Sequence, residues 1–180
     1  VDKNGGAYIG NFGFDRHAGE KPKPTTLVRV APNGKASIAA EDLWFPNGAV
    51  ITPDNSTLII AETRASRLTA FDILRNGELK SRRVFAETSN MYPDGICLDE
   101  EGAIWVADPK NKEVIRIKEG GEITDKLELE TRGAYACMLG GNDGKTLFVC
   151  TNTGSGPEIA NQRAGKIETT RVKIAKAGRP

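Results

Sequence analysis

Short runs in which apolar and polar residues alternate follow one another along the whole chain, with Gly, Asn or Asp between many of them. Alternation over about four to eight residues is typical of half-buried β-strands. The runs are also rich in β-branched residues, which excludes a helical solenoid. The pattern therefore predicts an all-β chain.

One unit recurs four times. Each unit opens with a predicted pair of strands joined by a turn, over residues 1–10, 49–61, 96–107 and 138–150. Matching Tyr8, Leu58, Ile104 and Leu147 places the units 50, 46 and 43 residues apart. Periods of about 40 to 50 residues are typical of four-stranded β-propeller blades. Third strands are predicted over residues 27–30, 67–73, 113–117 and 165–167, and charged outer strands over 78–85 and 122–129.

Residues 1–180 are therefore predicted to form one partial β-propeller domain of about four blades. An open arc of four blades leaves two apolar blade faces without neighbours. We expect N-terminal blades to be missing from this sequence, because six blades of about 45 residues would need roughly 290 residues.

Composition and charge narrow the classes of partner. The chain carries 25 basic and 24 acidic residues, a net charge of +1, which does not favour nucleic acid as a partner. No stretch approaches the roughly 20 apolar residues of a membrane span, and the first residues lack the pattern of a signal peptide. The expected location is cytoplasmic, without membrane association, and the oligomeric state is left open.

Cysteine and histidine offer little catalytic chemistry. Cys97, Cys137 and Cys150 lie in apolar runs and are expected to be buried thiols. His17 is the single histidine and lies in a polar stretch, so a zinc site made of several histidines is excluded within this chain. We expect His17 to lie in a surface loop.

Two first strands open with nearly the same phrase. Asn47 lies in a Pro-Asn-Gly sequence and Asp94 in a Pro-Asp-Gly sequence 47 residues later, one blade period. In a propeller, such equivalent positions converge on the central channel. Calcium takes about six to eight oxygen ligands in irregular geometry, so amide and carboxylate oxygens would suit it. The alternative is that both phrases form ordinary tight turns, for which Asn-Gly and Asp-Gly are common.

The same register extends to the other units. Tyr135, 41 residues after Asp94, is predicted to line the channel mouth, or else to pack between blades. Thr52 and Asp99 each lie five residues after the predicted rim residue, and Asp2 matches them in the first unit. The rim residue of the first unit would therefore precede Val1.

Several phrases together resemble the senescence marker protein, gluconolactonase and luciferin-regenerating enzyme family. They are residues 45–54, residues 68–72, residues 93–95 followed by 101–107, and residues 136–141 ahead of 147–149. The resemblance runs over nearly the whole chain. It implies a six-bladed propeller that hydrolyses a sugar lactone with one divalent cation, calcium as the first choice and zinc as the second.

The resemblance also implies roles for individual residues. Asn47 and Asp94 are the expected metal ligands, and Asp94 is in addition a candidate general base. The family's further ligands, a glutamate and often an asparagine, are expected before Val1. Asn11, Glu62 and Tyr135 are the candidate substrate contacts, although a loop or packing role is open for each.

The leading hypothesis is thus a gluconolactonase-like, metal-dependent hydrolase acting on a small-molecule sugar lactone. One alternative is a related metal-dependent esterase or phosphotriesterase. Another is a propeller that serves only as a binding scaffold. A serine or cysteine nucleophile is disfavoured, because the cysteines lie in strand-like runs and Ser155 has no evident base.

Overall fold

The computed structural model describes residues 1–178 and consists of four antiparallel sheets, with one short 3₁₀ helix, η1 (Pro157–Ile159). Within each sheet, every strand pairs with its neighbour in sequence. The first sheet contains β1 (Ala7–Ile9), β2 (Thr25–Val30) and β3 (Ala36–Leu43). The second contains β4 (Pro46–Ile51), β5 (Thr57–Glu62), β6 (Arg67–Ile73) and β7 (Leu79–Glu87). The third contains β8 (Ile96–Leu98), β9 (Ile104–Asp108), β10 (Glu113–Ile117) and β11 (Ile123–Glu128), and the fourth contains β12 (Gly133–Gly140), β13 (Thr146–Asn152) and β14 (Lys166–Arg171).

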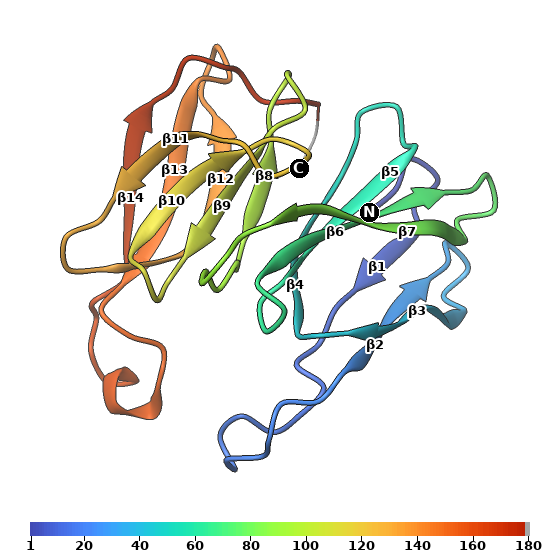
Figure 1. Ribbon diagram of the computed structural model, residues 1–180, viewed down its shortest axis with the longest axis horizontal. Coiled ribbons are helices and arrows are strands. Elements are labelled where there is room, and N and C mark those ends of the chain that lie inside the picture. The colour runs from blue at the N-terminus through green and yellow to red at the C-terminus, as the bar shows by residue number, and fades with distance from the viewer. Residues whose placement is uncertain (179–180) are drawn as a thin grey trace.

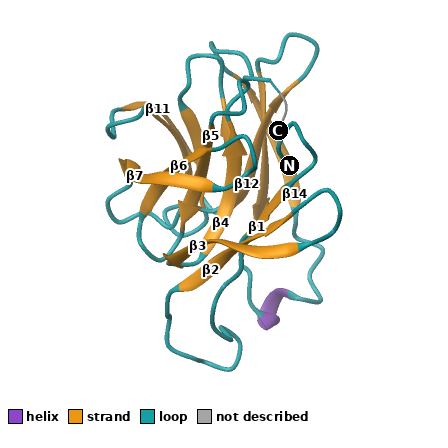
Figure 2. Ribbon diagram, turned by 90° about the vertical axis from the view of Figure 1, so that its right-hand side faces the viewer, coloured by secondary structure: helices purple, strands orange, loops and turns teal. Residues whose placement is uncertain are grey.

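The sheets follow one another in chain order, the first two on one side of Figure 1 and the last two on the other. Figure 2, turned by 90°, shows that strands and connecting loops make up almost the whole described chain. The predicted all-β class and the fourfold repeat are confirmed.

Strand β5 of the second sheet is buried on both faces, because its side chains alternate between the two neighbouring sheets. Leu58 and Ile60 of β5 pack with Leu27 and Leu43 of the first sheet. Ile59, between them, belongs to a cluster that continues into the third sheet. A strand covered on both faces reads as a continuous apolar run, which explains residues 58–61.

The third and fourth sheets share a separate cluster, in which Cys97 and Trp105 pack against Cys137 and Leu147. The outer faces of the two end sheets carry exposed apolar side chains. Ile38 is 61% exposed on the first sheet and Ile167 is 70% exposed on the fourth. The expectation that two apolar sheet faces lack neighbours therefore holds for residues 1–178.

The repeat register is confirmed with two corrections. Asp2, Thr52 and Asp99 each open the turn that leads into the equivalent strands β1, β5 and β9, and their N–H groups donate to the carbonyl groups of Gly6, Thr57 and Ala103. Ala7 rather than Tyr8 is then equivalent to Leu58, because the second sheet's turn is one residue longer. The other correction concerns residues 1 and 2, which do not form a strand.

The polar predictions have mixed outcomes. His17 is exposed in the loop of residues 10–24, as expected. Cys97 and Cys137 are buried, but Cys150 is exposed, so the prediction for Cys150 is wrong. Cys150 faces the uncovered side of the fourth sheet, opposite Ile167 in the strand pairing. Among residues 1–178, no helix is long and apolar enough to cross a membrane.

Candidate active site

Three of the predicted site residues lie side by side on neighbouring sheets. Asn47 is the second residue of β4, Asp94 lies just before β8, and Tyr135 is in β12. The Gly48 N–H donates to the Asp94 carbonyl at 3.0 Å, and the Gly95 N–H donates to the Tyr135 carbonyl at 3.0 Å. We call the edge where β4, β8 and β12 begin the site edge.

The glycines after Asn47 and Asp94 permit this close approach. A Cβ on Gly48 would lie 2.4 Å from the Asp94 carbonyl oxygen, and one on Gly95 would lie 2.6 Å from the Ala136 Cα. Neither glycine has a positive φ. Asn47 and Gly48 lie within β4 and residues 93–95 form no tight turn, so the tight-turn alternative is wrong. Each glycine is required because backbone from the next sheet passes against it.

Replacing Gly48 tests this packing. Gly48→Ala is expected to lower the free energy of unfolding by about 1–3 kcal/mol, because its methyl group would overlap three backbone atoms of residues 94–96. Urea unfolding of the natural protein measures the effect. Gly165→Ala is the matched control, since Gly165 has open space around its Cβ position and no positive φ. Equal stability of the two variants would contradict the packing argument.

Asp94 is a carboxyl group whose pKa is raised by burial. Burial raises the pKa of Asp94 to about 6, against the opposing effects of a hydrogen bond from Asn47 and the positive charge of Arg16, while the Asp108 charge raises it further. No ion pair to Asp94 forms within residues 1–178. A half-buried carboxylate without a cationic partner is costly to maintain for folding alone.

The donor atoms fit a hard divalent cation. Asn47 offers an amide oxygen and Asp94 a carboxylate, the oxygen donors that calcium takes. In the described part of the chain, no group of three or more His, Cys, Asp or Glu side chains could hold a metal ion. Asn47 and Asp94 alone are therefore too few to make a complete cation site within residues 1–178.

Glu62 has a different environment from the one expected of a substrate contact. It is fully buried, and its carboxylate accepts hydrogen bonds from the Trp44 N–H at 2.7 Å and from Arg67 at 3.0 Å, besides Thr69 and Arg82. Burial raises the pKa of Glu62, but these donors outweigh that effect and bring it below the ordinary value. Glu62 thus holds the segment that leads into Asn47.

Asp108 holds the segment that leads into Asp94, as Glu62 holds the segment before Asn47. This side chain is fully buried at the end of β9 and accepts the Tyr92 N–H at 3.2 Å, two residues before Asp94. Glu62 and Asp108 are equivalent in the repeat, each the fifth residue from the start of the aligned second strand, Leu58 and Ile104. The recurrence of an acidic residue at the fifth position of this strand is visible in the sequence, and it could have identified Glu62 and Asp108 as residues that support the site.

The other two predicted substrate contacts, Tyr135 and Asn11, differ in their position relative to Asp94. Tyr135 is half-buried, and it falls at a register shift of β12. Asn11 is exposed, where it donates to the Thr26 carbonyl at 2.9 Å and accepts from Thr25 at 2.7 Å. Asn11 therefore has partners within its own sheet and is not brought to Asp94 by any described contact.

Arg16 is a residue near the candidate site that sequence reasoning missed. It lies in the loop of residues 10–24, and its guanidinium donates to Ser155 Oγ at 3.1 Å, in the loop that follows β13. The two loops extend from the same end of the molecule, at the bottom of Figure 1. Its charge acts on Asp94. No local motif marks Arg16, because its relevance depends on how far these loops reach.

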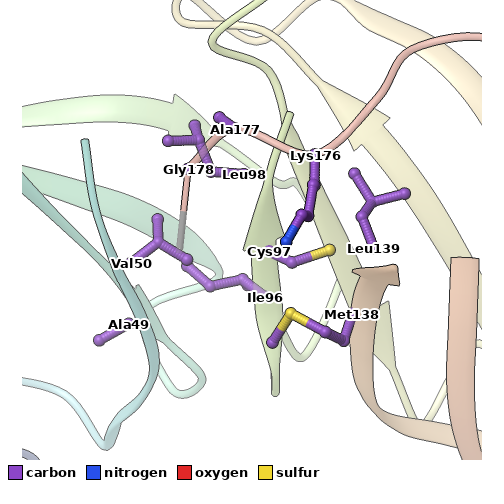
Figure 3. Close-up of a pocket in the computed structure, with 10 residues that line it drawn as sticks. All are labelled: Ala49, Val50, Ile96, Cys97, Leu98, Met138, Leu139, Lys176, Ala177 and Gly178. Carbon is purple, nitrogen blue, oxygen red and sulfur yellow. The ribbon is translucent and has the colours of Figure 1, made fainter. Parts of the chain in front are cut away.

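A pocket at the inner strands lies apart from this arrangement. Figure 3 shows its ten lining residues, which come from β4, β8, β12 and the C-terminal segment. They are Ala49, Val50, Ile96, Cys97, Leu98, Met138, Leu139, Lys176, Ala177 and Gly178. The lining is apolar except for Lys176, and it includes neither Asn47 nor Asp94, so we do not assign the chemistry to this pocket.

Known proteins are similar to this chain in sequence and in fold. The chain is 28% identical over 172 residues to 6-deoxy-6-sulfogluconolactonase of Pseudomonas putida, covering 92% of this chain and 57% of that relative. It is 26% identical over 191 residues to a pentonolactonase of Haloferax volcanii, covering 100% of this chain and 62% of that relative. The crystal structure of a calcium-binding protein, regucalcin, from Agrobacterium tumefaciens superposes with a TM-score of 0.75 at 23% identity, covering 99% of this chain and 60% of that one.

The chain therefore spans about three fifths of the length of these relatives. Residues 1–153 match the family described as the SMP-30/Gluconolactonase/LRE-like region. That match extends over the four sheets up to the end of β13 and includes Asn47, Asp94 and Tyr135. The chain belongs to the SMP-30/gluconolactonase/LRE-like family.

Proposed function

We propose that the protein hydrolyses a sugar lactone at a divalent-cation site to which this chain contributes Asn47 and Asp94. The observation that carries the proposal is that the Asn47 side-chain amide and the half-buried Asp94 carboxylate, which forms no ion pair within residues 1–178, lie on neighbouring sheets at the site edge. The names of two relatives, a sulfogluconolactonase and a pentonolactonase, support lactones as the substrate class.

Two residues of this chain would bind the cation, and one of them could also act as a base. Asn47 and Asp94 would hold the cation, calcium in the first place, through oxygen atoms. When bound, such a cation polarises a carbonyl group and lowers the pKa of a bound water. Asp94 is also a candidate general base, because its carboxylate is at the site.

Neighbouring residues would orient the sugar. Tyr135 lies next to Asp94 across the sheet boundary and offers a hydroxyl group. Arg16 brings a positive charge near Asp94 and offers hydrogen bonds to substrate oxygens. We do not retain Glu62 as a substrate contact, because its carboxylate is fully buried and has four donors.

We further propose that the four sheets are consecutive blades of a six-bladed propeller. Residues 1–180 would then be one partial propeller domain, and the two exposed apolar sheet faces would pack against further blades. The remaining cation ligands would come from those blades, in keeping with the incomplete donor set on β4 and β8.

Cation binding and lactone hydrolysis test the proposal together. Calorimetric titration of the natural protein with calcium and with zinc is expected to show one site, and removing the cation with a chelator is expected to abolish hydrolysis of an aldonolactone. Faster turnover of phosphotriesters than of lactones would redirect the assignment to a related esterase. Absence of any cation binding would favour a scaffold without catalysis.

A further inference from the structure

We propose that Thr63 is a positioning residue whose hydroxyl group orients the Asn47 side chain and ties it to the segment that carries Asp94. The effect of Thr63 on cation affinity rests on the proposed function. The effect of Thr63 on the orientation of Asn47 does not. The proposal starts from two hydrogen bonds of one buried hydroxyl group.

Thr63 directly follows β5 and is 7% exposed. Its N–H donates to the Phe45 carbonyl at 3.1 Å, which holds Thr63 against the segment that precedes Asn47. Its Oγ1 donates to the Pro93 carbonyl at 2.7 Å and lies 3.2 Å from Asn47 Nδ2. One hydroxyl thus contacts the second sheet's site residue and the residue just before Asp94.

The direction of these bonds determines how the Asn47 amide is turned. A hydroxyl group has one hydrogen, and a carbonyl oxygen can only accept, so the Thr63 hydrogen is committed to Pro93. Thr63 Oγ1 must then accept from Asn47, which identifies the near atom of the amide as Nδ2. The Asn47 Oδ1 points the other way, forms no hydrogen bond within residues 1–178, and is available to a cation.

The same hydroxyl also limits how far Asn47 and Asp94 can separate. Pro93 and Asp94 are consecutive, and Asp94 accepts the Gly48 N–H at 3.0 Å. Two hydrogen bonds therefore connect the start of β4, and Thr63 behind it, to residues 93 and 94. Partners that orient the ligands of a cation contribute strongly to its affinity.

If the Thr63 hydroxyl served only the general fold, a hydroxyl group would be expected at the same position of the other repeats, and the third and fourth sheets have none there. In the aligned register, Pro109 and Asn152 occupy the position of Thr63 in the third and fourth sheets. Neither carries a hydroxyl group. Thr63 is thus particular to the boundary between the two sheets that supply Asn47 and Asp94.

Thr63→Val removes the hydroxyl with little change in shape. In the natural protein, it is expected to weaken calcium binding by about 10 to 100-fold in calorimetry. Thr63→Ser, which keeps the hydroxyl, is expected to retain the parent affinity. Thr88→Val is the matched control, since Thr88 is 3% exposed and its hydroxyl has no hydrogen-bond partner within residues 1–178.

A second readout needs neither calcium nor activity. In the cation-free protein, the Asn47 side-chain NH₂ signals in ¹⁵N NMR are expected to show slow hydrogen exchange, and Thr63→Val should accelerate it while Thr63→Ser should not. Fast exchange in the unmutated protein would overturn the proposal, even if Thr63→Val fails to fold. Equal loss of calcium affinity in Thr63→Val and Thr88→Val would overturn it as well. If the parent protein binds no calcium, the proposed function fails, while the exchange measurement still decides the role of Thr63.

Discussion

Asp94→Ala in the natural protein is expected to abolish both calcium binding and lactone hydrolysis. Removing a carboxylate that contacts the cation should cost more than the roughly 10 to 100-fold loss of affinity seen when a partner of a ligand is removed. The loss of a candidate general base would lower the rate by a further factor of about 10² to 10⁴. Calorimetry and an aldonolactone assay measure the two effects separately.

The folding of this variant distinguishes a functional carboxylate from a structural one. Asp94 makes no ion pair within residues 1–178, and burying an unpaired charge costs free energy. Asp94→Ala is therefore expected to leave the free energy of unfolding of the cation-free protein unchanged or higher. Asp125→Ala is the control, because Asp125 is exposed on β11. If Asp94→Ala retains calcium affinity, Asp94 is not a ligand.

Glu62→Ala is expected to lower the free energy of unfolding by about 3–5 kcal/mol, the usual cost of breaking a buried ion pair by removing one partner. The variant would leave Arg67, Arg82 and the Trp44 N–H without their common acceptor. The segment that leads into Asn47 would lose an anchor, so calcium affinity should also fall. Urea unfolding gives the first effect and calorimetry the second.

The pH dependence of the free energy of unfolding tests whether the charge of Glu62 causes the stabilisation. Because the folded protein holds the pKa of Glu62 below its ordinary value, the stabilisation is present above the ordinary carboxyl pKa and is lost as pH falls through the folded value. The stability difference between the parent and Glu62→Gln should therefore shrink in acid. Glu130→Ala, at an exposed position, should change little. A difference that is constant with pH would exclude an effect of the charge.

The sequence by itself determined the all-β class, the order of the four sheets and the equivalent positions of Asn47 and Asp94. Alternation predicted the strands because side chains in a strand point alternately to opposite faces. The repeat period placed Asn47 and Asp94 at equivalent positions, and Gly48 and Gly95 after them, because each unit repeats the same strand geometry. Those inferences need only local pattern and spacing.

Tertiary structure decided which side chains support or accompany these two. Thr63 lies 30 residues from Pro93, and Arg16 lies 139 residues from Ser155, yet each pair is joined by a hydrogen bond. Such contacts depend on the placement of neighbouring sheets and loops, which no local pattern encodes. Cys150 is exposed for the same reason: an apolar run in a strand shows that a face is fit for burial, but only a neighbouring sheet can bury it.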